Sequence, residues 1–269
     1  MRKAFLFPAI FTASLFSAAC NSGTAGDGPA AAQPASATQA LKEEWKENPD
    51  SLAILQRLIE SYSDAGAYDS ALALTDAQLK KDTANAFLWN MKATLHFEND
   101  DTTAAIHALE RAVSLYPRPE YLVALGTVYA EIKDPRCLSI ANDLMQGNRS
   151  KSGADAMFIR GMYYTYSHDA PKAILYYDSC LNLNYTYMFA YREKAIALYN
   201  MGQYAAALNV LKRAVTLQNN YDEGYYWMGR CLEKLGKKAD AIQSYQTALL
   251  YDPDYDEART ALQELKARP

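Results

Sequence analysis

Histidine is scarce in this chain. The three that occur, His96, His107 and His168, stand in separate segments without a carboxylate or cysteine at metal-ligand spacing. The sequence also has no H-E-x-x-H, no G-x-S-x-G and no phosphate-binding glycine loop, the patterns that place a zinc pair, a nucleophile or a nucleotide. The chain is therefore predicted not to be an enzyme and to hold no metal and no cofactor.

An excess of basic residues is also lacking. The chain has 27 Lys and Arg against 31 Asp and Glu, a net charge of −4 and a pI of about 5.5. Binding to nucleic acid depends on a basic face that neutralises phosphates, so this balance argues against nucleic acid as a main partner.

Long apolar runs are confined to the N-terminus. Arg2 and Lys3 precede an apolar run over residues 4–19, which is shorter than the ~20 residues that a spanning helix needs. A basic start, an apolar middle and small residues before a cleavage point are typical of a secretory signal peptide, predicted here over residues 1–19. No later segment is apolar enough to span a membrane.

The residues around Cys20 resemble the lipobox of bacterial lipoproteins. The segment Ser17-Ala18-Ala19-Cys20 has the small residues of that motif, although Ser17 stands where the family prefers Leu. The resemblance implies lipidation of Cys20, and Asn21 after it implies an outer-membrane destination facing the periplasm. The alternative is ordinary cleavage after Ala19, which leaves a free thiol. Residues 21–40 are almost entirely small and polar, so Cys20 and this stretch (20–40) are predicted to form a flexible tether.

The rest of the chain, residues 41–269, carries a repeat of 34 residues. Alanine recurs at this spacing or at twice this spacing, at Ala71, Ala105, Ala173, Ala207 and Ala241. Within each repeat the apolar residues recur every three or four positions, which indicates helices. Polar or glycine-bearing breaks fall in the middle of the repeat. Each repeat is therefore predicted to be two antiparallel helices that stack on their neighbours.

The residue types at equivalent positions of these repeats, called slots below, resemble the signature of the tetratricopeptide repeat. Residues 222–255 match its pattern with Tyr225, Met228, Gly229, Leu232, Ala241, Tyr245, Ala248 and Pro253, and residues 86–119 match with Trp89, Ala93, Ala105, Leu109, Ala112 and Pro117. The resemblance implies an all-α, right-handed superhelical solenoid of about six helix-turn-helix units and a C-terminal capping helix. The units are approximately 52–85, 86–119, 120–153, 154–187, 188–221 and 222–255, with the cap at 256–267. Unit 120–153 is degenerate, with a polar loop expected from Gly147 to Gly153.

Three cysteines lie within the repeats, at Cys137, Cys180 and Cys231. A disulfide or metal site is one alternative, but the number is odd and there is no C-x-x-C spacing. Cys180 also falls in a slot that other repeats fill with alanine. The three are therefore predicted to be small packing residues between helices.

The family binds an extended peptide or a partner helix in a concave groove that the first helices line. Transferring that face slot by slot gives twelve candidate groove residues: Phe87, Asn90, Phe97, Phe158, Met162, Tyr166, Phe189, Arg192, Tyr199, Asn200, Tyr226 and Arg230. Aromatic residues and Arg are the types that carry most interface energy. The Lys and Asn clamp by which some members hold an acidic C-terminus is not reproduced, because Gln56 and Glu60 occupy those slots.

The leading hypothesis is a lipid-anchored, non-enzymatic adaptor at the periplasmic face of the cell envelope that binds a protein or peptide in its groove. One alternative is a homo-oligomeric structural envelope protein without a separate client. Another is an accessory lipoprotein that presents substrates to an envelope protease or hydrolase.

Overall fold

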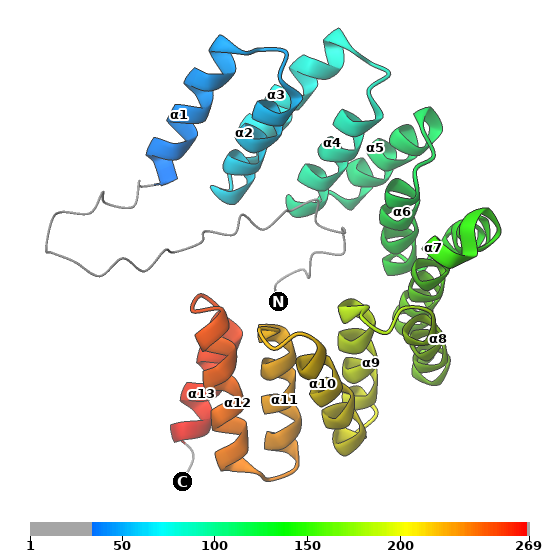
Figure 1. Ribbon diagram of the computed structural model, residues 1–269, viewed down its shortest axis with the longest axis vertical. Helices are drawn as coiled ribbons and strands as arrows, with labels where there is room; N and C mark the ends of the chain where they lie inside the picture. Colours follow the sequence, from blue (N-terminus) through cyan, green and yellow to red (C-terminus); the bar gives the residue numbers. More distant parts are fainter. Residues whose placement is uncertain (1–33, 268–269) are drawn as a thin grey trace, which may run out of the picture. The chain divides into compact units, whose positions relative to one another are not determined.

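The computed structural model describes residues 34–267, all in helices and short turns (Figure 1). The predicted signal peptide (1–19), Cys20 and residues 21–33 of the predicted tether lie outside the described residues. The helices are α1 (Pro34–Glu47), α2 (Leu52–Asp64), α3 (Tyr68–Lys81), α4 (Ala86–Glu98), α5 (Thr102–Leu115), α6 (Pro119–Glu131), α7 (Arg136–Tyr166), α8 (Ala170–Leu183), α9 (Met188–Asn200), α10 (Tyr204–Leu217), α11 (Asp222–Lys234), α12 (Lys238–Tyr251) and α13 (Asp256–Ala267). The predicted all-α class is confirmed.

The described residues form two compact units. The N-terminal unit comprises residues 34–121 and the C-terminal unit residues 122–267, so the boundary falls within α6. In the N-terminal unit the consecutive helices α1 to α5 pack on one another, and in the C-terminal unit the consecutive helices α7 to α13 do so. Within residues 34–267 no helix combines the length and the apolar character needed to cross a membrane.

The 34-residue period governs where helices begin. The second helices of the repeats start at Tyr68, Thr102, Arg136, Ala170, Tyr204 and Lys238, each 34 residues after the one before. Helix α1 starts at Pro34, one further period upstream, and packs against α2. It therefore occupies the place of a second helix in a preceding repeat. The prediction of a tether up to residue 40 is wrong for residues 34–40, because α1 has a face that half-buries Leu41 and Trp45 against the repeat that follows.

Each turn inside a repeat contains one residue in the left-handed region, with φ between 62° and 75°. Glycine occupies this position in three turns, and other residues occupy it in three: Gly66, Asp100, Lys133, His168, Gly202 and Gly236. The next residue donates its backbone N–H to a carbonyl five residues back, as in Gln203 to Leu198 at 2.9 Å. This arrangement is the Schellman motif, which ends one helix and redirects the chain into the next.

Helix α7 departs from the repeat. It runs without interruption for 31 residues, joining the second helix of one repeat to the first helix of the next. The predicted polar loop from Gly147 to Gly153 is therefore wrong. Two glycines and two serines disfavour a helix there by local propensity, but Ser152, Ala154 and Ala156 are buried. That packing outweighs a propensity cost of about 1 kcal/mol per glycine.

The core of each repeat is built from two kinds of recurring position, one that holds a small residue and one that holds a bulky residue. Ala71, Ala105, Ala173, Ala207 and Ala241 are all fully buried, and Tyr177 and Tyr245 are the largest fully buried side chains. Cys137, Cys180 and Cys231 are likewise buried and carry free thiols, which confirms that they are packing residues. Burial raises the pKa of the Cys137 and Cys231 thiols to about 12, so both are unreactive at neutral pH.

Candidate partner-binding face

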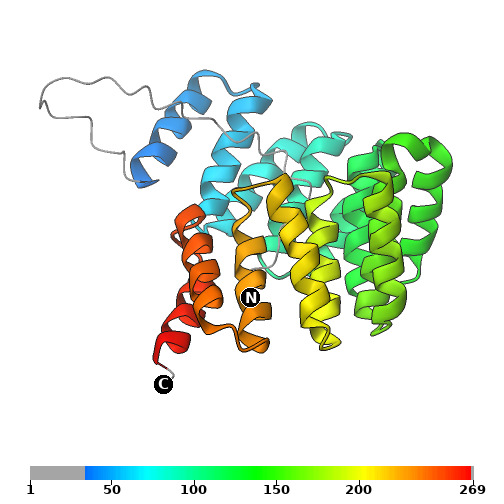
Figure 2. The ribbon, with the colours of Figure 1, turned by 60° about the horizontal axis from the view of Figure 1, so that its bottom comes forward.

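Two first helices of the C-terminal unit, α9 and α11, make direct contact, and α10, which joins them, packs against both (Figure 2). Their shared surface is called here the first-helix face. It is defined by Phe189, Arg192, Tyr199 and Asn200 of α9 and by Glu223, Trp227 and Arg230 of α11. Most of these side chains are half-buried, which leaves one edge of each open to solvent.

Arg192 is the buried cation of this face, with 3% of its surface exposed. Its Nε lies 2.9 Å from a carboxylate oxygen of Glu193, and its Nη1 lies 2.9 Å from a carboxylate oxygen of Glu223. Glu193 is the next residue, whereas Glu223 belongs to the following repeat. Two carboxylates therefore neutralise Arg192, so it ties neighbouring repeats together rather than presenting charge to a partner.

Arg230 has different surroundings. Its Nη1 donates to the Tyr226 hydroxyl at 2.8 Å, and its Nη2 lies 3.5 Å from the Tyr199 hydroxyl. Its guanidinium lies 5.7, 5.8 and 5.9 Å from the ring centroids of Tyr199, Tyr226 and Trp227, within cation–π range. It forms no ion pair with any carboxylate of residues 34–267.

The rings around Arg230 hold one another in place. Trp227 makes edge contacts with Tyr199 and Tyr226 at centroid distances of 5.6 and 5.5 Å. Tyr226 packs in turn against Tyr255, just before α13, at 5.0 Å. The residue that leads into the final helix therefore also supports this part of the first-helix face, and the aromatic side chains already pack against one another without a partner.

Several predicted groove residues are buried instead. Phe158 is 2% exposed and Met162 is 1% exposed, and the Phe158 ring packs against that of Tyr187 at 5.1 Å. Five of the twelve candidates are buried: Phe97, Phe158, Met162, Arg192 and Tyr226. The physical reason is that large side chains at these positions fill the space between successive repeats.

The other candidates keep some exposure. In the N-terminal unit, Phe87 and Asn90 are half-buried on α4. In the C-terminal unit, Tyr166, Phe189, Tyr199 and Arg230 are half-buried and Asn200 is exposed. The structure brings Tyr199 and Arg230 together, while Tyr166 lies at the end of α7.

The sequence comparison of slots missed Trp227. Its ring contacts both Tyr199 and Tyr226, although its position corresponds to Glu193 in the preceding repeat, which suggested no aromatic role. Its position beside Tyr226 and three residues before Arg230 is the sequence feature that could have identified it.

Other polar clusters of the described residues are satisfied internally. Tyr187 donates a hydrogen bond to Asp155 at 2.9 Å, and burial raises the pKa of that carboxyl. In the N-terminal unit Gln56 donates to Glu60 at 2.7 Å, and Ser63 donates to Glu98, whose pKa burial also raises. The slots that a peptide clamp would fill with Lys and Asn thus hold a hydrogen-bonded Gln–Glu pair.

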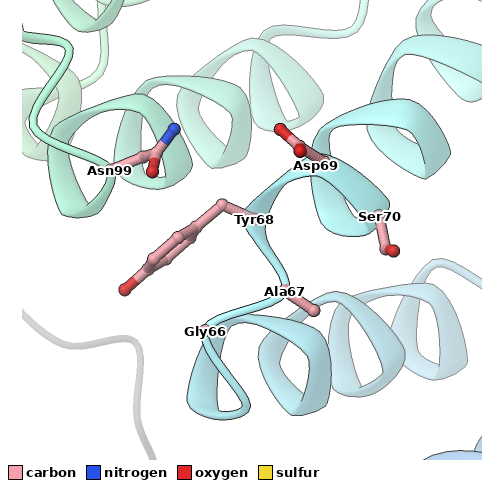
Figure 3. Close-up of a pocket in the computed structure, with 6 residues that line it drawn as sticks. All are labelled: Gly66, Ala67, Tyr68, Asp69, Ser70 and Asn99. Carbon is pink, nitrogen blue, oxygen red and sulfur yellow. The ribbon is translucent and has the colours of Figure 1, made fainter.

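A shallow surface hollow lies at the turn between α2 and α3. Figure 3 shows its lining, with the Tyr68 ring and the Asn99 amide on one side and Asp69 and Ser70 at the start of α3. It offers no convergent set of titratable groups. Residues 34–267 also contain no cluster of three or more His, Cys, Asp or Glu side chains placed to hold a metal ion.

Comparison with known proteins agrees with this geometry. Models of the tetratricopeptide repeat match residues 90–135 and residues 198–267. The crystal structure of a tetratricopeptide repeat protein from Parabacteroides merdae superposes with a TM-score of 0.67 at 17% sequence identity, covering 87% of this chain and 92% of that chain. At that identity the likeness concerns the fold.

Curated relatives are similar over part of their length. The DnaJ homolog subfamily C member 7 homolog of Dictyostelium discoideum is 24% identical over 200 residues, which are 74% of this chain and 34% of the relative. Serine/threonine-protein phosphatase 5 of Rattus norvegicus is 25% identical over 135 residues, which are 50% of this chain and 27% of the relative. The chain thus spans about a third or less of the length of these two relatives.

The repeat period, the paired helices with their recurrent turns, and these matches agree with one another. Stacked repeats of this kind form extended surfaces that serve protein binding. This chain is a tetratricopeptide-repeat protein with an all-α solenoid fold.

Proposed function

We propose that this protein is a non-enzymatic adaptor that binds a segment of a protein partner on the first-helix face. The observation that carries the proposal is the pair of half-exposed rings of Tyr199 and Trp227 beside the guanidinium of Arg230. The half-exposed ring of Phe189 lies on the same face, beside Arg192. Rigid aromatic and Arg side chains gain contact area and hydrogen bonds on binding while losing little conformational freedom.

The chemistry of the last helix favours a separate partner over end-to-end stacking of copies. The outward residues of α13 are polar, with Gln263, Glu264 and Lys266 exposed and Leu262 and Leu265 turned into the core. A terminal repeat with a polar outer face is typical of an array that ends in solvent. Sedimentation that detects a stable oligomer of the full chain would instead support the homo-oligomeric alternative.

The test is partner capture by the full chain. The protein, solubilised in detergent, serves as bait in an envelope extract of its own host, next to a Phe189→Ala/Tyr199→Ala variant. The control variant is Leu175→Ala/Leu250→Ala, because these leucines are 65% and 74% exposed on the second helices α8 and α12. Loss of the captured protein with the first variant and retention with the control supports the proposal. Equal capture by all three proteins would place the interface elsewhere.

The proposal extends to the N-terminus, where Cys20 is lipidated and the protein is held at the periplasmic face of the outer membrane. The support is the lipobox-like run Ser17-Ala18-Ala19-Cys20 after an apolar segment. Metabolic labelling with a fatty-acid probe tests it. Incorporation that disappears in Cys20→Ser, with the protein leaving the membrane fraction, is expected. Unlabelled protein in the soluble periplasmic fraction would contradict it.

A further inference from the structure

Arg230 is a half-buried cation without a counter-ion in the described part of the chain. The comparison with Arg192, on the adjacent helix, is informative because both belong to the same face. Arg192 is neutralised by two carboxylates, whereas Arg230 contacts hydroxyls and ring faces only. Partial burial of an unpaired charge costs free energy, so such a charge commonly marks a place where an anion binds.

The guanidinium of Arg230 has N–H donors left over for such an anion, because its two hydrogen bonds use only one N–H of Nη1 and one of Nη2. A guanidinium carries five N–H donors in a planar fork that matches the two oxygens of a carboxylate. The hydroxyls of Tyr226 and Tyr199 engage one edge of the fork, at 2.8 and 3.5 Å. The Trp227 ring lies beside the guanidinium and supplies an apolar wall next to the remaining donors.

We propose that Arg230, with Tyr199 and Trp227, forms a subsite that binds the carboxylate of an Asp or Glu side chain flanked by apolar residues in the partner segment. This inference rests on the proposed function, since it names the chemistry that the first-helix face selects. The carboxylate accepts a forked hydrogen bond from Arg230, and the apolar neighbour packs on the Trp227 and Tyr199 rings.

The surrounding charges favour a monoanion over a phosphate dianion. Glu233 lies three residues from Arg230 on the same helix, where it accepts a hydrogen bond from Tyr245 at 3.0 Å. Glu223 and Glu193 lie on the same face and are shared by the one guanidinium of Arg192. One unpaired cation beside these carboxylates neutralises a single negative charge, and a second negative charge would meet repulsion.

The experiment titrates defined probes into the full chain labelled with ¹⁵N at its tryptophan indoles. The chain has three tryptophans, and Trp227→Phe identifies the resonance of Trp227. The probes are a capped leucine–glutamate–leucine tripeptide, its leucine–glutamine–leucine counterpart, and inorganic phosphate. We expect a saturable shift of the Trp227 resonance and about tenfold tighter binding of the glutamate peptide than of the glutamine peptide.

Variants assign the preference to Arg230. Arg230→Gln should abolish it, and Arg230→Lys should retain a weaker one, because the lysine keeps the charge but loses the fork. Arg213→Gln, which removes the same charge from an exposed position on α10, should leave the preference intact. Thermal melts of each variant verify that the repeats remain folded.

Three results would overturn the subsite: equal binding of the two peptides, no saturable shift with the glutamate peptide, or tighter binding of phosphate than of that peptide. Failure here is distinguishable from failure of the proposed function. A partner that Phe189→Ala/Tyr199→Ala loses and Arg230→Gln retains would leave the adaptor proposal standing and remove the carboxylate subsite.

Discussion

Gly161 and Tyr177 share one volume in the core of the C-terminal unit. A Cβ atom on Gly161 would overlap the Tyr177 ring, and in the last repeat a Cβ on Gly229 would lie 2.5 Å from the Tyr245 ring. Other repeats fill the same two slots with Ala93 and Leu109, or with Ala195 and Leu211, all buried. Where the second position holds the larger Tyr the first holds Gly, and where the second holds Leu the first holds Ala. The combined volume of the two side chains is therefore similar in these repeats.

This relationship predicts that Gly161→Ala destabilises the protein by about 2 kcal/mol, because the Tyr177 ring has no space to move into. Adding Tyr177→Leu should recover part of the loss, with a coupling of about 1 kcal/mol or more, since the double variant recreates an Ala–Leu pair. The control is Gly147→Ala on the same helix. Its Cβ would meet open space, so it should stabilise by about 0.5–1 kcal/mol. Urea unfolding measures the parent protein, the two single core variants Gly161→Ala and Tyr177→Leu, their double variant and the control. Strictly additive effects of the two core changes would contradict the shared volume.

The left-handed turn residues predict a stabilising substitution. His168 adopts φ 63° in an exposed turn, where a side chain costs more than glycine. His168→Gly should therefore raise the free energy of unfolding by about 0.5–1 kcal/mol. Gly202→Ala, at the same place in another repeat, should lower it by a similar amount. A lower melting temperature for His168→Gly would show that its side chain contributes more than its backbone costs.

Asp155 predicts a pH dependence of stability. Burial raises the pKa of Asp155 above its ordinary value of 3.8 in the folded protein. The folded state then holds this proton more tightly than the unfolded state. Asp155 therefore stabilises the folded state fully below pH 3.8, and this stabilisation is lost as the pH rises through the raised pKa of the folded state. The loss in the free energy of unfolding is about 1.4 kcal/mol for each pH unit that separates the folded and unfolded pKa values.

Asp155→Asn removes the titration while keeping an acceptor for Tyr187. It should raise the unfolding midpoint at pH 7 and change it little at pH 3. Asp254→Asn, at an exposed turn, is the control and should show a smaller difference between the two pH values. A destabilised Asp155→Asn at pH 7 would mean that the charged carboxylate is the favoured form.

The ion pairs of Arg192 with Glu193 and Glu223 predict that replacing Arg192 strongly destabilises the folded protein. Arg192→Met leaves Glu193 and Glu223 facing each other without a cation, at a cost of about 3 kcal/mol. Adding Glu193→Gln and Glu223→Gln should restore much of this loss, because the remaining groups are neutral. Denaturant midpoints of the single and triple variants measure the difference. A triple variant no better than the single one would assign the loss to packing of the Arg192 stem.

The continuity of α7 predicts the effect of proline. Ser150→Pro should cost about 3 kcal/mol, because proline removes a helical hydrogen bond and clashes with the preceding turn. The control is Tyr185→Pro, two repeat lengths after Pro117, where the preceding residue Asn184 is already extended (φ −141°, ψ 97°). Tyr185→Pro should leave the helical content and the melting temperature nearly unchanged. Tolerance of Ser150→Pro would indicate a loop between residues 147 and 153.

The repeat made most of the fold predictable. The repeats other than 120–153 bury the same positions, so small residues at a spacing of 34 reveal the helix pairs, and Gly66, Gly202 and Gly236 reveal the turns between them. The turns at Asp100, Lys133 and His168 carry no glycine and were visible only from their place in the period. The candidate face was located in part, since Tyr199 and Arg230 were predicted and do lie together.

Local composition misled the prediction at α1 and α7. Small and polar residues over 34–40 and 147–153 favour loops by propensity, at less than about 1 kcal/mol per residue. Contacts with neighbouring helices exceed that preference, as the buried Ser152 and Ala156 demonstrate.

The sequence by itself determines the 34-residue period, the helical class and the residue types available for binding, because all three are read from spacings along the chain. Which of those residues stay accessible depends on contacts between repeats. Arg192 is neutralised by Glu223, 31 residues away, and Phe158 is covered by Tyr187. Arg230 stays half-exposed and forms no ion pair within residues 34–267, because the residues packed around it are aromatic rather than acidic. Such long-range partners arise from the stacking of helices, and a pattern read within one repeat does not contain them.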